Sequence, residues 1–135
     1  MNQGKVIVGF IGAGGIASSH AFSLNSLKYY YDDAPGIELR AVCSVTKENR
    51  MLFAKRFDFI KSYDLEEFVA DEEINTVFIL GPNKVHYDHL KAAIGMTTVR
   101  HIYLEKPVCT NHDEEKAIAG LIKKYPWIKI QVGFQ

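Results

Sequence analysis

Two short stretches of this chain contain residue types that could take part in chemistry. The first is Glu105-Lys106-Pro107, which directly follows the apolar run 101–104 (HIYL). The second is the glycine loop 12–17 (GAGGIA), which follows a run rich in β-branched residues. In a parallel sheet, ligands bind outside the carboxyl ends of the strands, so both stretches are expected at one edge. A lysine and a nucleotide-binding turn at the same edge indicate hydride-transfer chemistry.

Each position of the glycine loop has a physical role in such a site. Gly12 permits a tight turn, and Gly14 lets the backbone approach a pyrophosphate with no side chain in the way. Ala17 allows a helix and a strand to pack closely, while the free N–H groups at the start of the helix bind phosphate oxygens. A glycine turn with a purely structural role is the alternative interpretation.

The end of the second predicted strand bears on which dinucleotide is bound. NAD-binding domains place an Asp or Glu there, which accepts a hydrogen bond from the ribose 2′-OH. This chain has Ser44 instead, and Asp32-Asp33 would lie at the wrong end of the first helix. A hydroxyl at Ser44, with Thr46, Lys47 and Arg50 nearby, tolerates a 2′-phosphate better than a carboxylate does. We therefore expect NAD or NADP as the cofactor, with NADP favoured.

Composition excludes several other classes of function. The 135 residues include 16 acidic and 16 basic side chains, so the balanced charge argues against nucleic-acid partners and against binding to an anionic membrane surface. No run of eighteen apolar residues predicts a membrane span, and the first residues lack the apolar region of a signal peptide. Cys43 and Cys109 are expected as reduced thiols, which favours a cytoplasmic protein. The spacing of His86 and His89, with no carboxylate cluster nearby, predicts no metal site.

Strand and helix patterns alternate along the whole chain. Strands are expected over 5–11, 37–45, a short piece near Ile60, 74–80, 101–104 and 128–134. Helices are expected over 16–31, 47–57 (capped by Thr46), 64–70 (with a capping box from Asp64), 85–94 and from Asn111, a cap, to 125. Their predicted buried stripes are His20, Leu24, Leu27 and Tyr31; Leu52, Phe53 and Phe57; and Ile118, Leu121, Ile122 and Tyr125. The pattern predicts one α/β domain over residues 1–135, a doubly wound parallel sheet (Rossmann fold) of about six strands.

Several stretches in this order resemble the Gfo/Idh/MocA family of NAD(P)-dependent oxidoreductases. They are 11–17 with His20, 38–43 with the helix end 54–57, 81–86 (GPNKVH), Glu105-Lys106-Pro107, and 132–135 (VGFQ). Together they span essentially the whole chain, and their ordered combination is specific.

The resemblance implies roles for particular residues. Asn83 and His86 would lie near the nicotinamide half of the cofactor, and Glu105 would line its pocket. Lys106 would point at a substrate hydroxyl and assist proton transfer, which makes it the expected catalytic residue. The expected cofactor-binding residues are therefore Gly12, Gly14, Gly15, Ile16, Ala17, Ser44, Thr46, Pro82, Asn83, His86, Glu105 and Lys106. The substrates implied are sugars, cyclitols, dihydrodiols and related hydroxyl compounds.

The chain also departs from the family pattern. Ser44 replaces the usual acid, and the segment 95–100 is longer than the usual turn into the fifth strand. Family members continue into a large α/β domain that forms the substrate site, supplies the Asp and His partners of the lysine, and often makes the dimer interface. We therefore expect a truncated enzyme that binds dinucleotide without turnover and whose complete form is a homo-oligomer. A stand-alone redox-sensing module is the alternative, and a methyltransferase would be recognised by binding S-adenosylmethionine instead.

Overall fold

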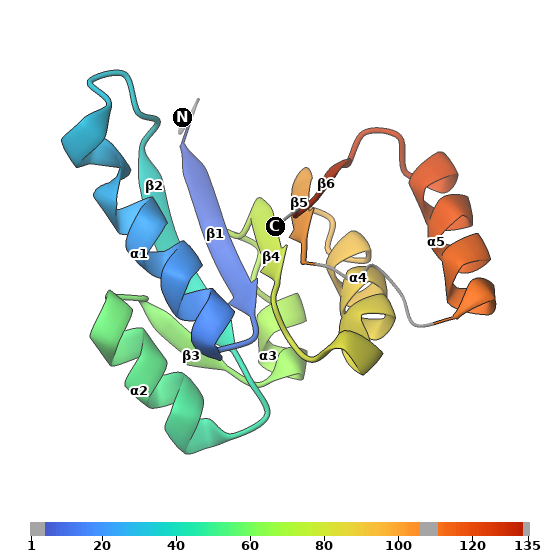
Figure 1. Cartoon of the computed structure of the whole chain (residues 1–135), viewed down its shortest axis with the longest axis horizontal. Helices are drawn as coiled ribbons and strands as arrows, with labels where there is room; N and C mark the ends of the chain where they lie inside the picture. Colours follow the sequence, from blue (N-terminus) through green and yellow to red (C-terminus); the bar gives the residue numbers. More distant parts are fainter. Residues whose placement is uncertain (1–4, 106–110, 134–135) are drawn as a thin grey trace.

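The core of the molecule is a parallel six-stranded sheet with the strand order β3-β2-β1-β4-β5-β6 (Figure 1). The computed structural model describes residues 5–105 and 111–133. The strands are β1 (Val6–Ile11), β2 (Ile37–Cys43), β3 (Lys61–Tyr63), β4 (Thr76–Ile79), β5 (His101–Leu104) and β6 (Lys129–Val132). Strand order runs outward in one direction from β1 to β3 and in the other from β4 to β6. The predicted doubly wound sheet is confirmed, and its order reverses between β1 and β4.

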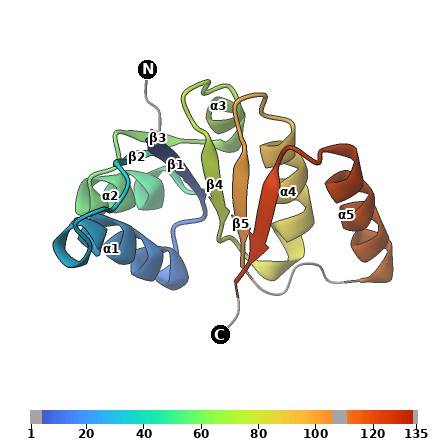
Figure 2. The same ribbon diagram turned by 90° about the horizontal axis from the view of Figure 1, so that it is seen from above.

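Helices cover the two faces of this sheet unequally. They are α1 (Gly15–Tyr30), α2 (Lys47–Phe57), α3 (Leu65–Val69), the 3₁₀ turn η1 (Asn83–Val85), α4 (His86–Ile94) and α5 (His112–Lys124). Figure 2 shows α1 and α2 on one face, over the β1–β3 half, and α4 and α5 on the opposite face, over the β4–β6 half. Within the described residues, no helix covers the β4–β6 half on the side that faces α1.

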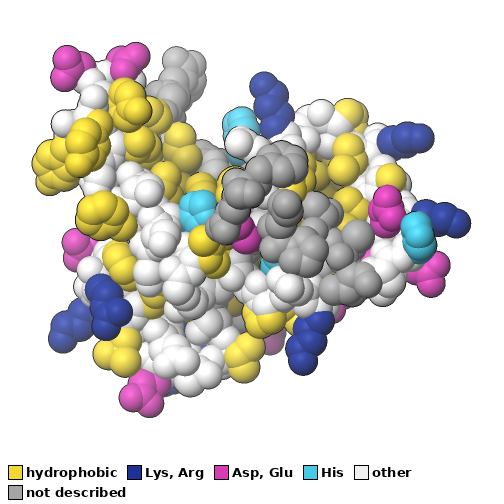
Figure 3. All heavy atoms as spheres, in the orientation of Figure 1, with side chains coloured by type: hydrophobic (Ala, Val, Ile, Leu, Met, Phe, Trp, Pro, Cys, Tyr) yellow, Lys and Arg dark blue, Asp and Glu magenta, His cyan; other side chains and the backbone are white. Residues whose placement is uncertain are grey.

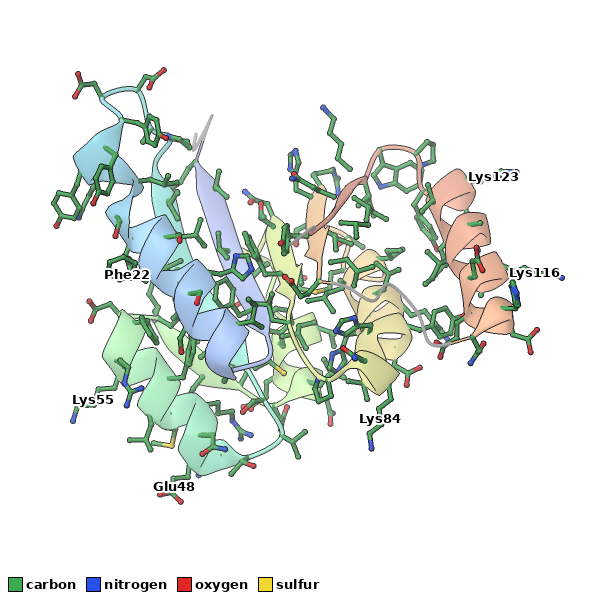
Figure 4. All side chains as sticks on the ribbon, viewed as in Figure 1. Phe22, Glu48, Lys55, Lys84, Lys116 and Lys123 are labelled. Atoms are coloured by element: carbon green, nitrogen blue, oxygen red, sulfur yellow. The ribbon has the colours of Figure 1, made fainter. Side chains whose placement is uncertain are left out.

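Two clusters of apolar side chains fill the spaces between the sheet and these helices. On the α1 side, the ring of Phe10 lies 5.0 Å from Phe59 and 6.3 Å from Phe53. On the α4 side, Val77 and Ile79 of β4 are fully buried. Neighbouring residues of a strand point to opposite faces, so one buried sheet supplies both clusters. Charged side chains such as Lys55, Lys116 and Lys123 point away from the sheet (Figure 4).

Most of the predicted elements form within a residue or two of their expected ends, but three residues predicted to face inward do not. Leu52 is 56% exposed, Tyr31 59% and Ile122 44%. Leu52 precedes Phe53, which is 6% exposed, and Phe53 and Ala54 are the residues of α2 that are buried. Tyr31 lies just beyond the last residue of α1, where the chain turns extended. Ile122 follows Leu121, which takes the inward position.

The predicted helix caps are confirmed at two of three sites. Asp64 accepts a hydrogen bond from the N–H of Glu67 at 2.8 Å, and Glu67 Oε1 accepts from the N–H of Asp64 at 3.0 Å, which completes a capping box. Asn111 caps α5 by accepting from the N–H of Glu114 at 2.8 Å. Thr46 occupies the N-cap position of α2, but its side chain makes no capping hydrogen bond. The prediction of a capping side chain at Thr46 was therefore wrong.

Helix α1 presents several aromatic side chains to the surface. Phe22, Tyr29 and Tyr30 of α1 are 67%, 75% and 78% exposed, and hydrophobic side chains gather around the far end of this helix in Figure 3. Over residues 5–105 and 111–133, none of the helices has both the length and the apolar character of a bilayer span.

Candidate functional site

A cavity of about 720 Å³ opens at the carboxyl ends of the central strands. It lies where the strand order reverses between β1 and β4, the position at which doubly wound sheets bind their ligands. Seven residues predicted from the sequence line it: Gly12, Gly14, Gly15, Ile16, Ser44, Thr46 and Pro82. Volumes of this order are typical of small-molecule and cofactor sites.

Gly12 fixes the path of the loop that leaves β1. Its φ is +124°, a conformation that L side chains rarely adopt. A Cβ at this position would lie 2.6 Å from the carbonyl carbon of Leu80 and 2.7 Å from the nitrogen of Gly81. The N–H of Gly12 donates to the carbonyl oxygen of Cys43 at 2.8 Å. The loop is therefore held against the ends of both β2 and β4, and only glycine fits there.

Gly14 and Gly15 have a different environment. A Cβ on either would meet no protein atom within 4 Å, so the space above both residues is open. Helix α1 starts at Gly15, has no acidic residue in its first turn, and receives no side-chain cap from Gly14. The first N–H groups of a helix lack intrahelical partners, and the helix dipole is positive at this end. This open space beside free donors fits a phosphate group.

Ala17 lies beneath the loop and is fully buried in the cluster on the α1 side. It does not line the cavity. Its small side chain packs α1 against the sheet, which is the physical role that the sequence predicted for it.

The loop after β2 forms another wall of the cavity, where Ser44, Val45 and Thr46 line it. The hydroxyl of Ser44 donates to the carbonyl oxygen of Thr46 at 3.2 Å. Arg50 Nη1 donates to the carbonyl oxygens of Ser44 and Val45 at 3.0 and 3.4 Å. Arg50 thus shapes the loop through its backbone, and the side chains that line the cavity here carry no positive charge.

Sequence reasoning missed several lining residues, among them Asn49, Asp64, Leu65 and His89. Asp64 directly follows β3 and could have been found by applying the strand-end rule to that strand. The signal was weak because β3 has only three residues. His89 was considered only as a metal ligand, whereas it lies beside Gly81, whose added Cβ would come within 3.0 Å of the His89 ring.

Two histidines of α4 behave differently at this edge. His86 is 1% exposed, and its Nε2 lies 2.7 Å from the carbonyl oxygen of Gly81, which anchors the turn before η1. His89 Nδ1 is the buried side-chain polar atom that lacks a hydrogen-bond partner among the described residues. Burial, and secondarily the charge of His86, lowers the pKa of His89. Both effects favour the neutral form of the His89 ring at the cavity wall.

Glu105 joins the end of β5 to α1. Its Oε2 lies 3.3 Å from Nε2 of His20, and the ring of His20 lies 4.9 Å from that of Tyr103. Burial and then the neighbouring Glu105 raise the pKa of Tyr103. Glu105, like Asn83 and His86, is not among the residues that line the cavity. The expected catalytic residue Lys106 lies outside the described residues, as does Cys109.

Among the described residues, the remaining groups at this edge offer no nucleophile or metal centre. Burial raises the pKa of the Cys43 thiol to about 11, and the charges of Asp64 and Glu67 add to this effect while Arg50 opposes it. Cys43 is therefore a protonated core thiol. Over residues 5–105 and 111–133, no group of three or more His, Cys, Asp or Glu side chains is arranged to hold a metal ion.

Comparison with known proteins agrees with this geometry. The family model GFO_IDH_MocA, "Oxidoreductase family, NAD-binding Rossmann fold", matches residues 6–134. Glucose-6-phosphate 3-dehydrogenase of Bacillus subtilis is 27% identical over 94% of this chain and 33% of its own length. Levoglucosan dehydrogenase of Pseudarthrobacter phenanthrenivorans is 30% identical over 86% of this chain and 30% of its own length.

Solved structures show the same similarity. Levoglucosan dehydrogenase in complex with NADH superposes with a TM-score of 0.85 at 27% identity, covering 95% of this chain and 34% of the other. The chain thus spans about a third of the length of the relatives it matches. It belongs to the Gfo/Idh/MocA oxidoreductase family and comprises that family's NAD-binding Rossmann domain.

Proposed function

We propose that this chain is the cofactor-binding part of a dehydrogenase that moves a hydride between a nicotinamide dinucleotide and a carbinol carbon of a sugar. The observation that supports this most directly is the open space over Gly14 and Gly15, which lies beside the unpaired N–H groups of α1 and within the 720 Å³ cavity. A pyrophosphate fits that space and no side chain of the described residues fills it.

Different segments of the cavity wall would bind different parts of the cofactor. The backbone of 14–16 would hold the pyrophosphate, and the loop 44–46 with Asn49 would hold the adenosine half. Pro82 and His89 line the wall beside β4, where the other half would lie. When bound, the nicotinamide ring supplies the site that accepts or donates the hydride. His86 contributes indirectly, because its bond to Gly81 fixes the turn that contains Pro82.

Lys106 is the residue that we propose for proton transfer. It directly follows Glu105 in the sequence, and Glu105 is held by His20 at the end of β5. An ammonium group next to a substrate hydroxyl lowers the pKa of that alcohol. The hydroxyl proton would then pass to a base, the His of the His and Asp pair expected from the second domain, as the hydride leaves the carbinol carbon. Lys106→Ala is expected to lower kcat of the complete enzyme by a much larger factor than it weakens NADH binding.

A sugar is the proposed substrate class because two similar proteins are named for sugar substrates, glucose-6-phosphate and levoglucosan. Cyclitols and dihydrodiols offer the same secondary alcohol and form the wider class. The relatives are about three times as long as this chain, so we propose that most sugar contacts come from a second domain. The exposed aromatic side chains of α1 support the proposal that the complete protein forms a larger assembly, such as a homo-oligomer.

The test is a pair of measurements on the 135-residue chain. Titration followed by NADH fluorescence should give saturable one-to-one binding, whereas incubation with NAD and levoglucosan or glucose-6-phosphate should give no NADH. Absence of NADH binding would refute the proposed function. Robust turnover would instead refute the proposal that the sugar contacts lie in another domain.

A further inference from the structure

The wall of the cavity beside β2 contains an acidic side chain, Asp64. Asp64 follows β3, whereas NAD-binding domains usually have their acid at the end of β2. The residue expected to be acidic, at the end of β2, is Ser44. In the sheet, β3 pairs in parallel with β2, and Cys43 is the register partner of Tyr63. Ser44 and Asp64 are the next residues of these two strands. Neighbouring strands are about 4.8 Å apart, so Asp64 lies beside Ser44, which occupies the position where an acid was expected.

Asp64 has both the location and the free acceptor that a ribose contact requires. It lines the cavity together with Ser44 and Asn49. One carboxyl oxygen, Oδ1, accepts the N–H of Glu67 at 2.8 Å, which fixes the orientation of the group. None of the hydrogen bonds among the described residues involves the second oxygen, Oδ2. The capping box therefore holds a carboxylate in place while leaving one acceptor available.

The cationic groups nearby do not offset this charge inside the cavity. Arg50 is bonded to the backbone carbonyl oxygens of 44 and 45, and neither Arg50 nor Lys47 lines the cavity. The basic residues that suggested NADP from the sequence alone thus do not line the cavity, whereas the carboxylate of Asp64 does.

We propose that Asp64 accepts a hydrogen bond from the adenosine ribose of the cofactor and thereby makes the site selective for NAD over NADP. The carboxylate at the end of β3 performs the task that an acid at the end of β2 performs in other dinucleotide-binding domains. This inference rests on the proposed function, because it assumes that the cavity binds a dinucleotide. It reverses the preference for NADP that Ser44 suggested.

The experiment compares NADH and NADPH affinities of the wild-type chain with those of Asp64→Asn. An Asn side chain still caps α3 through its amide oxygen, so folding is retained while the negative charge is removed. Glu67→Gln is the matched control: it removes the same charge from the same capping box, but Glu67 does not line the cavity. Circular dichroism melts of all three chains check that the fold is unchanged.

The wild type should bind NADH at least tenfold more tightly than NADPH, and Asp64→Asn should reduce that ratio by about tenfold. Glu67→Gln should leave the ratio within about twofold. If the wild type binds NADH but Asp64→Asn keeps its ratio, or if the control shifts it equally, the inference about Asp64 is wrong and the proposed function stands. If the wild type binds NADPH more tightly, the inference is likewise wrong. Failure to bind either dinucleotide overturns both.

Discussion

An added methyl group should have different effects at Gly12 and at Gly14 of the glycine loop. In Gly12→Ala the new Cβ would lie 2.6 Å from the carbonyl carbon of Leu80, 2.7 Å from the Gly81 nitrogen and 2.8 Å from the Leu80 oxygen. All three atoms belong to the backbone, so no side chain can rotate away. In Gly14→Ala the Cβ would meet no protein atom within 4 Å. The first substitution should therefore affect the fold, and the second should affect the ligand.

The size of the Gly12 effect follows from two contributions. Holding a non-glycine residue at a φ of +124° costs about 1–3 kcal/mol, and forcing apart packed backbone segments costs about 1–3 kcal/mol more. The sum, roughly 2–6 kcal/mol, is a large part of the roughly 5–15 kcal/mol that stabilises a typical domain. Gly14→Ala should change the free energy of unfolding by less than about 1 kcal/mol and weaken NADH binding at least tenfold.

Urea unfolding and NADH fluorescence titration on both variants give the two quantities. A Gly12→Ala chain as stable as the wild type would refute the close contact between the β1 loop and the end of β4. A Gly14→Ala chain that binds NADH normally would refute the placement of the pyrophosphate.

Two further predictions concern buried titratable groups. Burial raises the pKa of Asp71, but hydrogen bonds from the Glu73 N–H, the Tyr63 hydroxyl and Arg40 outweigh it and leave the pKa below its ordinary value. This carboxylate therefore stabilises the native state fully above about pH 4, and the stabilisation is lost as the pH falls further. Asp71→Ala should lower the free energy of unfolding by about 2–3 kcal/mol at pH 7. An unchanged urea midpoint would contradict this prediction. For His89, whose pKa burial lowers, the unfolded chain gains a proton below about pH 6.5 before the native state does, so stability falls as the pH drops through that range. His89→Leu should consequently gain stability relative to the wild type between about pH 8 and pH 5, and a pH-independent difference would show that the ring is not held neutral.

The sequence predicted the fold well because its signals are local and repeated. Apolar runs such as 6–11 and 101–104, separated by helical periodicity, specify buried parallel strands. The errors at Leu52 and Ile122 arose beside another apolar residue, Phe53 or Leu121, because periodicity alone does not say which of two adjacent apolar residues faces the core.

The site was predicted less completely because part of it depends on register between strands. Gly12 and Gly14 were found from their spacing, and Ser44 from its place at a strand end. Asp64 was missed because the three-residue strand before it gave a weak signal, and its place beside Ser44 depends on the pairing of Cys43 with Tyr63. Likewise, the contact of Glu105 with His20 joins residues 85 positions apart, and no local pattern contains it.

The central claim, that the cavity at the β1–β4 edge binds a dinucleotide, is tested most directly by mapping the NADH site on the chain itself. Addition of NADH to the isotopically labelled chain should shift the backbone amide resonances of 12–16, 44–46 and 81 in NMR spectra, the segments that line the cavity. The resonances of α5, on the far side of the molecule (Figure 2), should stay unchanged. Shifts confined to other surfaces, or no saturable shifts at millimolar NADH, would contradict the account.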